Sequence, residues 1–156
     1  MQKSLVLDTC LLVLLMVGLT NKKYIGKHKR LHPVYNSAHF EKLLAMVRGA
    51  RLVCTAHILT ETSNLLRQIS DPMKSEIQET MRRYVDRMDE VQIPGKQACK
   101  AQSFIRLGLT DAAIIMLNPK TIHILSVDLD LIVEAYRNGF HVTNLTPFLH
   151  DRASFS

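Results

Sequence analysis

The sequence predicts an α/β fold in three layers, with a parallel sheet of about five strands and helices on both of its faces. Short apolar segments alternate along the chain with longer segments whose apolar residues recur at helical spacing. The apolar segments are continuous, as expected for strands buried on both faces of a parallel sheet. Because the 156 residues contain neither an internal repeat nor a linker, we expect residues 1–156 to form a single domain.

The first third of the chain begins with a strand over residues 4–7, and a helix over residues 9–17 follows it and ends near Gly18. Residues 20–36 form a basic insertion that is interrupted by a glycine and a proline, so we expect an exposed or irregular loop there. Ser37 is the expected N-cap of the helix that follows the insertion.

The middle of the chain contains a second strand over residues 51–55 and a helix over residues 57–69. An aspartate and a proline then mark the start of a helix over residues 73–88. Residues 91–93 are a short third strand at most, and residues 96–107 are expected to form one further helix.

In the last third, Thr110 is the expected cap of a short helix that ends at an asparagine–proline pair. A fourth strand covers residues 121–127, and a helix follows over residues 129–137. The fifth strand covers residues 141–145. Strands and helices therefore alternate from one end of the chain to the other.

The formal net charge of the chain is +6 at pH 7, and its isoelectric point is about 9.4. A basic surface favours polyanionic partners, with nucleic acid ahead of an anionic membrane or an acidic protein. Because many basic domains bind no polyanion, the charge indicates a class of partner and nothing finer.

The cysteine pattern and the apolar N-terminal stretch indicate in which compartment of the cell the protein is expected. Cys10, Cys54 and Cys99 form no C-x-x-C pair and are odd in number, so we expect reduced thiols in a cytoplasmic protein. The apolar run over residues 10–19 is about half the length of a membrane span. A signal peptide is the alternative, but Asp8 lies inside the apolar stretch and no small-residue cleavage site follows. We therefore expect no membrane partner.

Acidic side chains lie where the predicted strands end. Asp8 ends the first strand, and Asp128 and Asp130 follow the fourth. Glu61 lies about one turn into the helix after the second strand, and Asp111 opens a later helix. In an open α/β sheet the carboxyl ends of the strands form the ligand-binding edge, so we expect these acids to converge there.

Each acid also has a purely structural interpretation. Asp111 could stabilise a helix N-terminus, and Asp128 could cap the helix that it precedes. Glu61 alone could be a solvated helix residue. Asp8 is harder to explain in this way, because it interrupts apolar sequence and a buried charge needs a partner. Their joint position at strand ends is what favours a functional site.

Clustered carboxylates need a counter-ion. Two like charges about 5 Å apart repel by about 3 kcal/mol at an effective dielectric constant near 20. Such a cluster persists by binding protons or a cation, and ligands that are all oxygen favour Mg²⁺ or Mn²⁺. On a basic protein a hard divalent cation suggests phosphate chemistry with a metal-activated water as nucleophile.

Four short motifs resemble those of the PIN-domain ribonucleases. They are VLDTC with Asp8, LTETSNLL with Glu61, LTDAAII with Asp111 and ILSVDLDL with Asp128. The resemblance covers about residues 4–145 in the correct order, and its specificity comes from the whole set. Serine stands at position 126, where the family usually has threonine, and the hydroxyl is retained.

The resemblance implies a parallel sheet of strand order 3-2-1-4-5 and an endonuclease that cleaves single-stranded RNA with Mg²⁺ or Mn²⁺. The residues that would hold the metal and act in catalysis are Asp8, Glu61, Asp111 and Asp128. Thr9 would orient the first carboxylate, with Ser126 as a second supporting group, and Asp130 would be a further ligand or support the others. Many small members of the family are toxins of toxin–antitoxin pairs and are often dimeric. The partners implied are therefore RNA, a protein antitoxin and a second copy of the chain.

The basic insertion, residues 20–36, is longer than a compact member of the family needs. Its cations could follow an RNA backbone, with Tyr24 or Tyr35 stacking on bases. The cations concerned are Lys22, Lys23, Lys27, Lys29 and Arg30. A solvated basic loop without a ligand is an equally good interpretation.

Two other functions remain open. A phosphatase of the haloacid dehalogenase type needs D-x-D after its first strand, whereas Thr9 and Cys10 follow Asp8 here. A receiver-like domain needs paired acids near its start and a late lysine, and this pattern is missing too. A non-catalytic RNA- or protein-binding module of the same fold is the stronger alternative.

Overall fold

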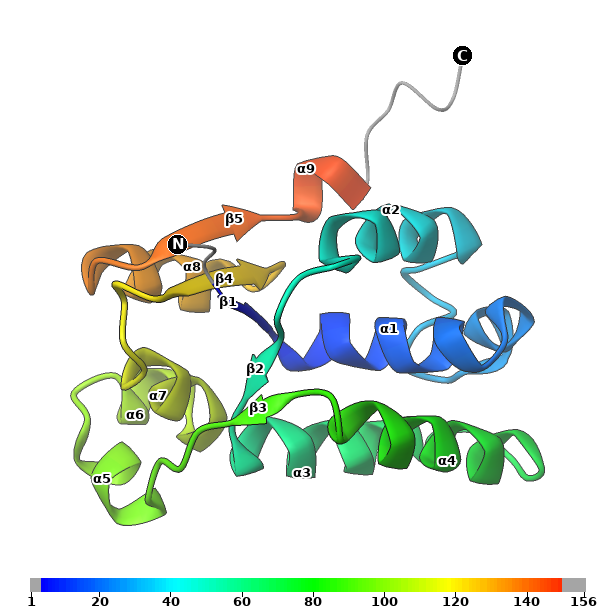
Figure 1. The fold of residues 1–156 in the computed structure, drawn as a ribbon, viewed down its shortest axis with the longest axis horizontal. Helices are drawn as coiled ribbons and strands as arrows, with labels where there is room; N and C mark the ends of the chain where they lie inside the picture. The colour runs from blue at the N-terminus through cyan, green and yellow to red at the C-terminus, as the bar shows by residue number, and fades with distance from the viewer. Residues whose placement is uncertain (1–3, 150–156) are drawn as a thin grey trace.

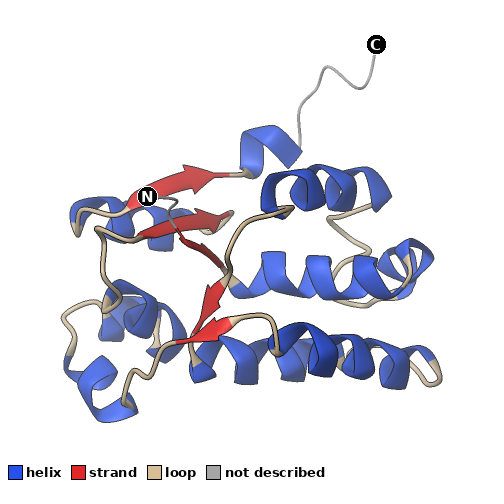
Figure 2. Cartoon of the chain, in the orientation of Figure 1, coloured by secondary structure: helices blue, strands red, loops and turns tan. Residues whose placement is uncertain are grey.

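The computed structural model describes residues 4–149, and within them the chain alternates short parallel strands with helices (Figures 1 and 2). The strands are β1 (Ser4–Leu7), β2 (Val53–Cys54), β3 (Asp89–Glu90), β4 (Ile122–Ser126) and β5 (His141–Asn144). The helices are α1 (Thr9–Thr20), the 3₁₀ helix η1 (Lys22–Lys27), α2 (Ser37–Val47), α3 (Ala56–Leu66), α4 (Met73–Val85), α5 (Gly95–Lys100), α6 (Phe104–Leu107), α7 (Leu109–Ile115), α8 (Leu129–Arg137) and α9 (Thr146–Leu149). The predicted α/β class is confirmed.

The strands of residues 4–149 pair in two parallel ladders. β4 lies between β1 and β5 in a three-stranded sheet, and β2 pairs with β3 in a two-stranded sheet. One isolated parallel bridge, Leu5 to Leu52, connects the two ladders, and the Leu5 amide donates to the Arg51 carbonyl over 2.8 Å. The single five-stranded ladder that the sequence predicts is therefore divided at this point.

The third strand lies two residues earlier than predicted, at Asp89–Glu90. Its hydrogen bonds come from the backbone, because the amides of Asp89 and Val91 donate to the carbonyls of Leu52 and Cys54 over 2.9 and 2.8 Å. The side chain of Val91 is exposed. The prediction was based on the apolar residues 91–93, but a strand at the edge of a sheet is defined by its backbone pairing and needs little burial of its side chains.

Two helix caps differ from the predictions. Asn36 caps α2, because its side chain accepts from the His39 amide while the His39 ring accepts from the Asn36 amide, so Ser37 is only the first helical residue. Gly108, with φ 85°, precedes α7, and the Thr110 hydroxyl donates to Glu61 over 2.7 Å. In both places a tertiary or reciprocal contact outweighs the simple cap preference.

Two further segments are organised differently from the predictions. Part of the basic insertion is helical, since α1 extends to Thr20 and η1 follows it. Ile25, His28 and Leu31 are buried there, so the insertion packs on the protein and is not a solvated loop along its whole length. The helix predicted over residues 96–107 is divided into α5 and α6.

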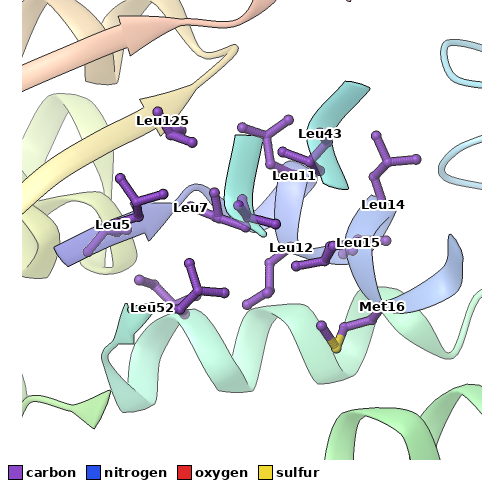
Figure 3. Close-up of a cluster of buried hydrophobic side chains, with 14 of the residues drawn as sticks. Leu5, Leu7, Leu11, Leu12, Leu14, Leu15, Met16, Leu43, Leu52 and Leu125 are labelled. Atoms are coloured by element: carbon purple, nitrogen blue, oxygen red, sulfur yellow. The ribbon is translucent and has the colours of Figure 1, made fainter. Parts of the chain in front are cut away.

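Helix α1 forms the centre of the core, with α2, α3 and α4 packed around it (Figures 1 and 3). Every residue from Leu11 to Gly18 is buried. Surrounding helices on several sides explain why this segment is apolar on all faces, as a fully buried helix must be. Within residues 4–149, no helix has both the length and the apolar character needed to span a bilayer.

Helices α1 and α2 approach each other closely at Gly18. A β-carbon added at Gly18 would lie 2.1 Å from Cδ2 of the buried Phe40. The absence of a side chain at Gly18 therefore lets the Phe40 ring lie directly on the α1 backbone.

Candidate active site

Asp8 lies at the junction of β1 and α1, where it is both the end of the strand and the cap of the helix. Its Oδ1 accepts the Leu11 amide over 3.0 Å, which caps α1. Its Oδ2 accepts the Val127 amide over 2.9 Å and the Ser126 hydroxyl over 2.5 Å. The side chain is buried, and these three donors explain how a carboxylate is accommodated within such an apolar stretch.

The environment of Asp8 opposes its ionisation in spite of those donors. Burial raises the pKa of the Asp8 carboxyl, and the negative charge of Asp128 raises it further. The hydrogen bonds from Ser126, Leu11 and Val127 lower it, but the net direction is upward. A positive charge next to Asp8 would therefore be stabilising.

Ser126 connects the ends of β1 and β4. Its hydroxyl donates to Asp8 and accepts the Asp128 amide over 3.0 Å, and its side chain is fully buried. The carboxylate oxygens of Asp8 accept hydrogen bonds from Leu11, Ser126 and Val127, and in residues 4–149 none comes from Thr9. Within the described chain, Ser126 is the side chain that orients this carboxylate.

Asp128 has two roles at once. Its Oδ1 accepts the amides of Asp130 and Leu131 over 3.0 and 3.4 Å and so caps α8, as one interpretation of the sequence expects. Its charge also raises the pKa values of Asp8 and Asp111. The structural and the functional interpretations of Asp128 are therefore compatible.

Asp111 is the acid with the least compensation. It lies in the first turn of α7 and is half-buried, and within residues 4–149 its carboxylate accepts no hydrogen bond and forms no ion pair. Burial, followed by the charges of Asp128, Asp8 and Glu61, raises the pKa of Asp111 to about 7. These four acids, which lie far apart in the sequence, therefore act on one another through space.

Glu61 reaches this group from α3. Its Oε2 accepts the Thr110 hydroxyl over 2.7 Å, so the carboxylate is directed towards the start of α7 and the neighbouring Asp111. The side chain is exposed to solvent. Thr110 is thus a site residue that sequence reasoning assigned only as a cap, because its partner lies 49 positions away.

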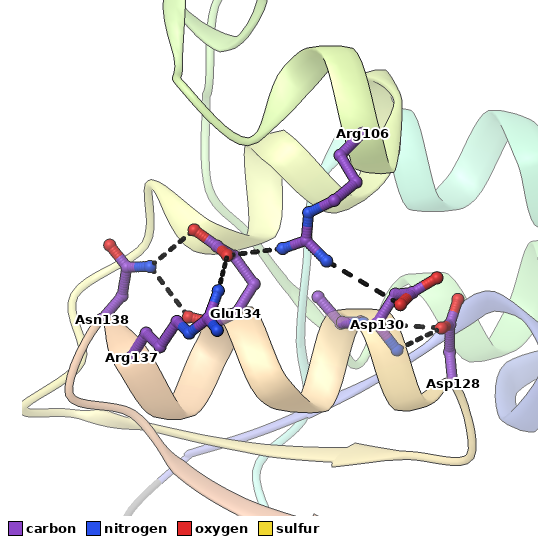
Figure 4. A network of polar contacts seen from close by, with 7 residues as sticks. Arg106, Asp128, Asp130, Glu134, Arg137 and Asn138 are labelled. Carbon is purple, nitrogen blue, oxygen red and sulfur yellow. Dashed lines mark hydrogen bonds and ion pairs between the residues drawn. The ribbon is translucent and has the colours of Figure 1, made fainter.

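The Asp130 carboxylate takes part in ion pairs on the surface of α8, while its amide donates to Asp128 (Figure 4). Its Oδ1 lies 3.7 Å from Nη1 of Arg106, and Nη2 of Arg106 lies 2.6 Å from Oε2 of Glu134. Arg137 approaches the same oxygen of Glu134 at 4.0 Å. Asp130 thus interacts with a cation from α6, unlike Asp111, and no motif in the sequence points to Arg106 as its neighbour.

The residues fit a hard cation in charge and chemistry, although their side chains are not gathered into a ligand set. Across residues 4–149, no three histidine, cysteine, aspartate or glutamate side chains are arranged to hold a metal ion. The available donors are carboxylate oxygens, the type that Mg²⁺ and Mn²⁺ prefer. The uncompensated charge at Asp111 is the specific feature that a cation would neutralise.

A hollow of about 400 Å³ lies between Cys10, two positions after Asp8, and part of the basic insertion. It is lined by Cys10, Lys29, Arg30, Pro33, Val34, Tyr35 and Gln68. Burial, with the nearby Cys10 and Asp8, raises the pKa of Tyr35 to about 12, so its phenol stays protonated at physiological pH. Nη2 of Arg30 lies 3.5 Å from Sγ of Cys10. Cys10 is therefore a second site neighbour that the sequence did not indicate.

Of the other candidate RNA-binding residues, Lys29 also lines this hollow, whereas Lys22, Lys23 and Lys27 do not. Lys22 forms an ion pair with Glu41 of α2, and Lys23, Lys27 and Lys29 are exposed. The Tyr24 hydroxyl donates to Glu76 of α4 over 2.6 Å. Of the two aromatic candidates, only Tyr35 lines the hollow beside the acids.

Two other hollows bear on where the site lies. One of about 340 Å³ is lined by Glu61 and in part by His57, Asn64 and Thr110. A larger hollow of about 770 Å³ lies between α3 and α4 and includes none of the four acids. Size alone therefore does not identify the site.

Comparisons with protein-family models, with curated proteins and with solved structures gave no match for this chain.

Proposed function

We propose that this chain is an endoribonuclease that hydrolyses single-stranded RNA with the help of Mg²⁺ or Mn²⁺. One observation carries the proposal. Asp111 is half-buried without a partner among the described residues, and the charges of Asp128, Asp8 and Glu61 help to raise its pKa to about 7. Carboxylates in this state take up a proton or a cation, and perturbed acids at a sheet edge are typical of catalytic sites.

The strand pairing supports the resemblance on which the RNA substrate depends. The two ladders β1-β4-β5 and β2-β3 are joined by the bridge from Leu5 to Leu52, and counting that bridge as a pairing would give the order β3-β2-β1-β4-β5. The resemblance implies the same order, in a three-layer PIN-like domain. Asp8 and Asp128 follow the two central neighbours, β1 and β4, where ligands of open α/β sheets bind.

The residues of the chain have distinct parts in the proposed reaction. Asp111, Asp128, Glu61 and Asp8 would hold the ion. When bound, such an ion polarises a phosphoryl oxygen and lowers the pKa of a water molecule. Ser126 fixes the Asp8 carboxylate, and Thr110 directs Glu61 towards Asp111.

The test is cleavage of a mixed pool of RNA sequences with Mg²⁺ or Mn²⁺ against the same reaction in EDTA. Asp111→Asn keeps the shape of the side chain and removes its charge, so we expect cleavage to fall by at least about a hundredfold, as when a catalytic group is lost. Asp86→Asn is the matched control, because Asp86 is an exposed acid at the end of α4. Equal cleavage by the wild type and Asp111→Asn would refute the proposal.

The proposal extends to the toxin role that the resemblance suggests, with an antitoxin and a second copy of the chain as partners. Induced expression in a bacterial host should then arrest growth. Asp8→Asn should relieve the arrest at the same protein level, since it removes the carboxylate that β1 delivers. Arrest by both proteins alike would separate toxicity from the site.

One observation favours a second function, a PIN-like module that binds RNA or protein without cleaving. Within the described residues no three side chains form a ligand set for a metal. If this arrangement persists in solution, divalent cations will neither stabilise the protein nor support cleavage. Metal titration with a thermal readout separates the two functions, because a ligand of the folded state raises the melting temperature.

A further inference from the structure

Part of the basic insertion is fixed in place beside the acidic site. His28 is fully buried, with Nε2 3.3 Å from the Leu66 carbonyl and Nδ1 accepting the Arg30 amide over 3.2 Å. The Lys29 amide donates to the Gln68 carbonyl over 3.0 Å. Since burial lowers the pKa of His28, its ring is neutral at physiological pH. These contacts attach residues 28–30 to the C-terminal end of α3.

The anchored segment directs Arg30 towards the first turn of α1. Nη2 of Arg30 contacts Sγ of Cys10, which is two positions from Asp8. Within residues 4–149 Arg30 forms no ion pair with an acid, whereas Arg51, Arg106 and Arg137 each do. A thiol is a weak acceptor, so the described contacts leave most donors of this guanidinium for another ligand.

The hollow beside Arg30 has a shape and lining that suit a nucleotide. Its volume of about 400 Å³ falls in the range of small-ligand sites. Arg30 and Lys29 contribute positive charge, and Pro33, Val34 and Tyr35 contribute apolar and aromatic surface. In proteins that bind single-stranded nucleic acid, cationic side chains usually contact the phosphates and aromatic side chains stack on the bases.

We infer that Arg30 positions the substrate by binding an RNA phosphate adjacent to the one that is cleaved. The nucleotide that carries this adjacent phosphate lies in the hollow lined by Pro33, Val34 and Tyr35. The inference rests on the proposed ribonuclease function, which it extends with a specific substrate contact. Arginine suits the role, because its planar fork binds two phosphate oxygens at once. The fixed backbone at His28 holds the guanidinium near the acids without an ion pair to them.

The first experiment measures binding without cleavage. A fluorescent single-stranded oligoribonucleotide is titrated into the Asp111→Asn protein, with and without Arg30→Ala, at several salt concentrations. We expect Arg30→Ala to weaken binding by about tenfold or more and to reduce the slope of log K against log salt by about 0.7, the value for one phosphate of a single strand. Arg30→Lys should restore the slope but only part of the affinity, because lysine cannot form the fork.

Lys27→Ala is the matched control. Lys27 is an exposed cation of the same insertion, at the end of η1, and it does not line the hollow. We expect a smaller loss of affinity from this change, of about threefold or less. Equal losses of affinity and slope in Arg30→Ala and Lys27→Ala would overturn the inference, because both residues would then contribute only general positive charge.

A second binding experiment tests which phosphate of the RNA Arg30 contacts. A set of oligoribonucleotides each carries one uncharged methylphosphonate, next to the cleaved bond or several nucleotides away. The penalty of the adjacent methylphosphonate should disappear in Arg30→Ala, while the distant one should cost the same in both proteins. If the adjacent substitution costs as much in Arg30→Ala as with Arg30 present, the contact does not exist.

Kinetics with the cleaving protein separate this inference from the proposed function. Arg30→Ala should raise KM about tenfold with kcat within about threefold, as expected when a residue binds substrate and transition state alike. Thermal melting should show that Arg30→Ala and Lys27→Ala are both folded. If the wild type cleaves RNA and Arg30→Ala has the same KM, the role of Arg30 is refuted and the ribonuclease proposal is not. A wild type that cleaves no RNA refutes the ribonuclease, and the binding experiment then decides whether Arg30 contacts RNA in a non-catalytic module.

Discussion

The Ser126 hydroxyl donates a hydrogen bond of 2.5 Å to Oδ2 of Asp8, although 118 positions separate the two residues in the sequence. The same hydroxyl accepts the backbone amide of Asp128. One buried side chain therefore holds the ends of β1 and β4 together and connects two of the four clustered acids.

Removing this hydroxyl should weaken both the fold and the site. Ser126→Ala leaves Asp8 buried with one donor fewer, so the pKa of Asp8 should rise further and the free energy of unfolding should fall by about 1–3 kcal/mol. Urea unfolding monitored by circular dichroism measures the loss, and RNA cleavage should fall with it. Ser126→Thr retains the hydroxyl and should retain activity. Ser37→Ala is the control and should change stability by less than about 0.5 kcal/mol, since Ser37 is exposed and Asn36 is the cap.

The uncompensated charge of Asp111 predicts an unusual dependence of stability on pH. The folded-state pKa of about 7 lies above the ordinary value of 3.8, so between these values the folded protein holds a proton that the unfolded chain has lost. This group should therefore make the metal-free protein less stable as the pH rises from about 4 to about 7, by about 4 kcal/mol in total, since each pKa unit corresponds to about 1.4 kcal/mol.

Asp111→Asn should remove that dependence. In EDTA at pH 8 the variant should be more stable than the wild type by up to about 4 kcal/mol, while its cleavage activity is lost. Chemical unfolding at pH 5 and pH 8 measures both effects. The exposed Asp86 makes Asp86→Asn the control, and parallel pH profiles for the wild type and Asp111→Asn would show that Asp111 carries no such strain.

A divalent cation should stabilise the wild type. At a concentration one hundred times its Kd, Mg²⁺ or Mn²⁺ should add about 2.7 kcal/mol to the free energy of unfolding, and the melting temperature should rise accordingly. The rise should be absent in Asp111→Asn and present in Asp130→Asn, because Asp130 forms an ion pair with Arg106. Sodium chloride at matched ionic strength controls for screening. A rise that is lost in Asp130→Asn would instead make Asp130 a ligand.

The contact between α1 and α2 gives a prediction that is independent of function. Gly18→Ala places a methyl group where Cδ2 of Phe40 lies 2.1 Å away, so we expect a loss of about 1–3 kcal/mol from overpacking. Gly26→Ala, where the added atom meets nothing within 4 Å, is the control. Thermal unfolding of both variants tests the difference, and equal stability would mean that Phe40 moves aside without cost.

The sequence by itself determined the features that depend on local composition. The segments at β1 and β4 are strands because they are short and rich in valine, isoleucine and leucine, residues that are buried in a parallel sheet. The acids at the ends of these strands follow directly from their positions in the chain. Asp128 is a helix cap as expected, because capping requires only neighbouring amides.

Only the tertiary structure decided the features that depend on distant partners. Asp130 is only two positions from Asp128, yet its carboxylate interacts with Arg106 of α6. Glu61 reaches α7 through the hydroxyl of Thr110. The basic insertion is anchored at His28, which brings Arg30 into contact with Cys10 in the first turn of α1. The physical reason is that the direction of a side chain follows from which helices pack against its own, and such long-range contacts leave no local pattern in the sequence.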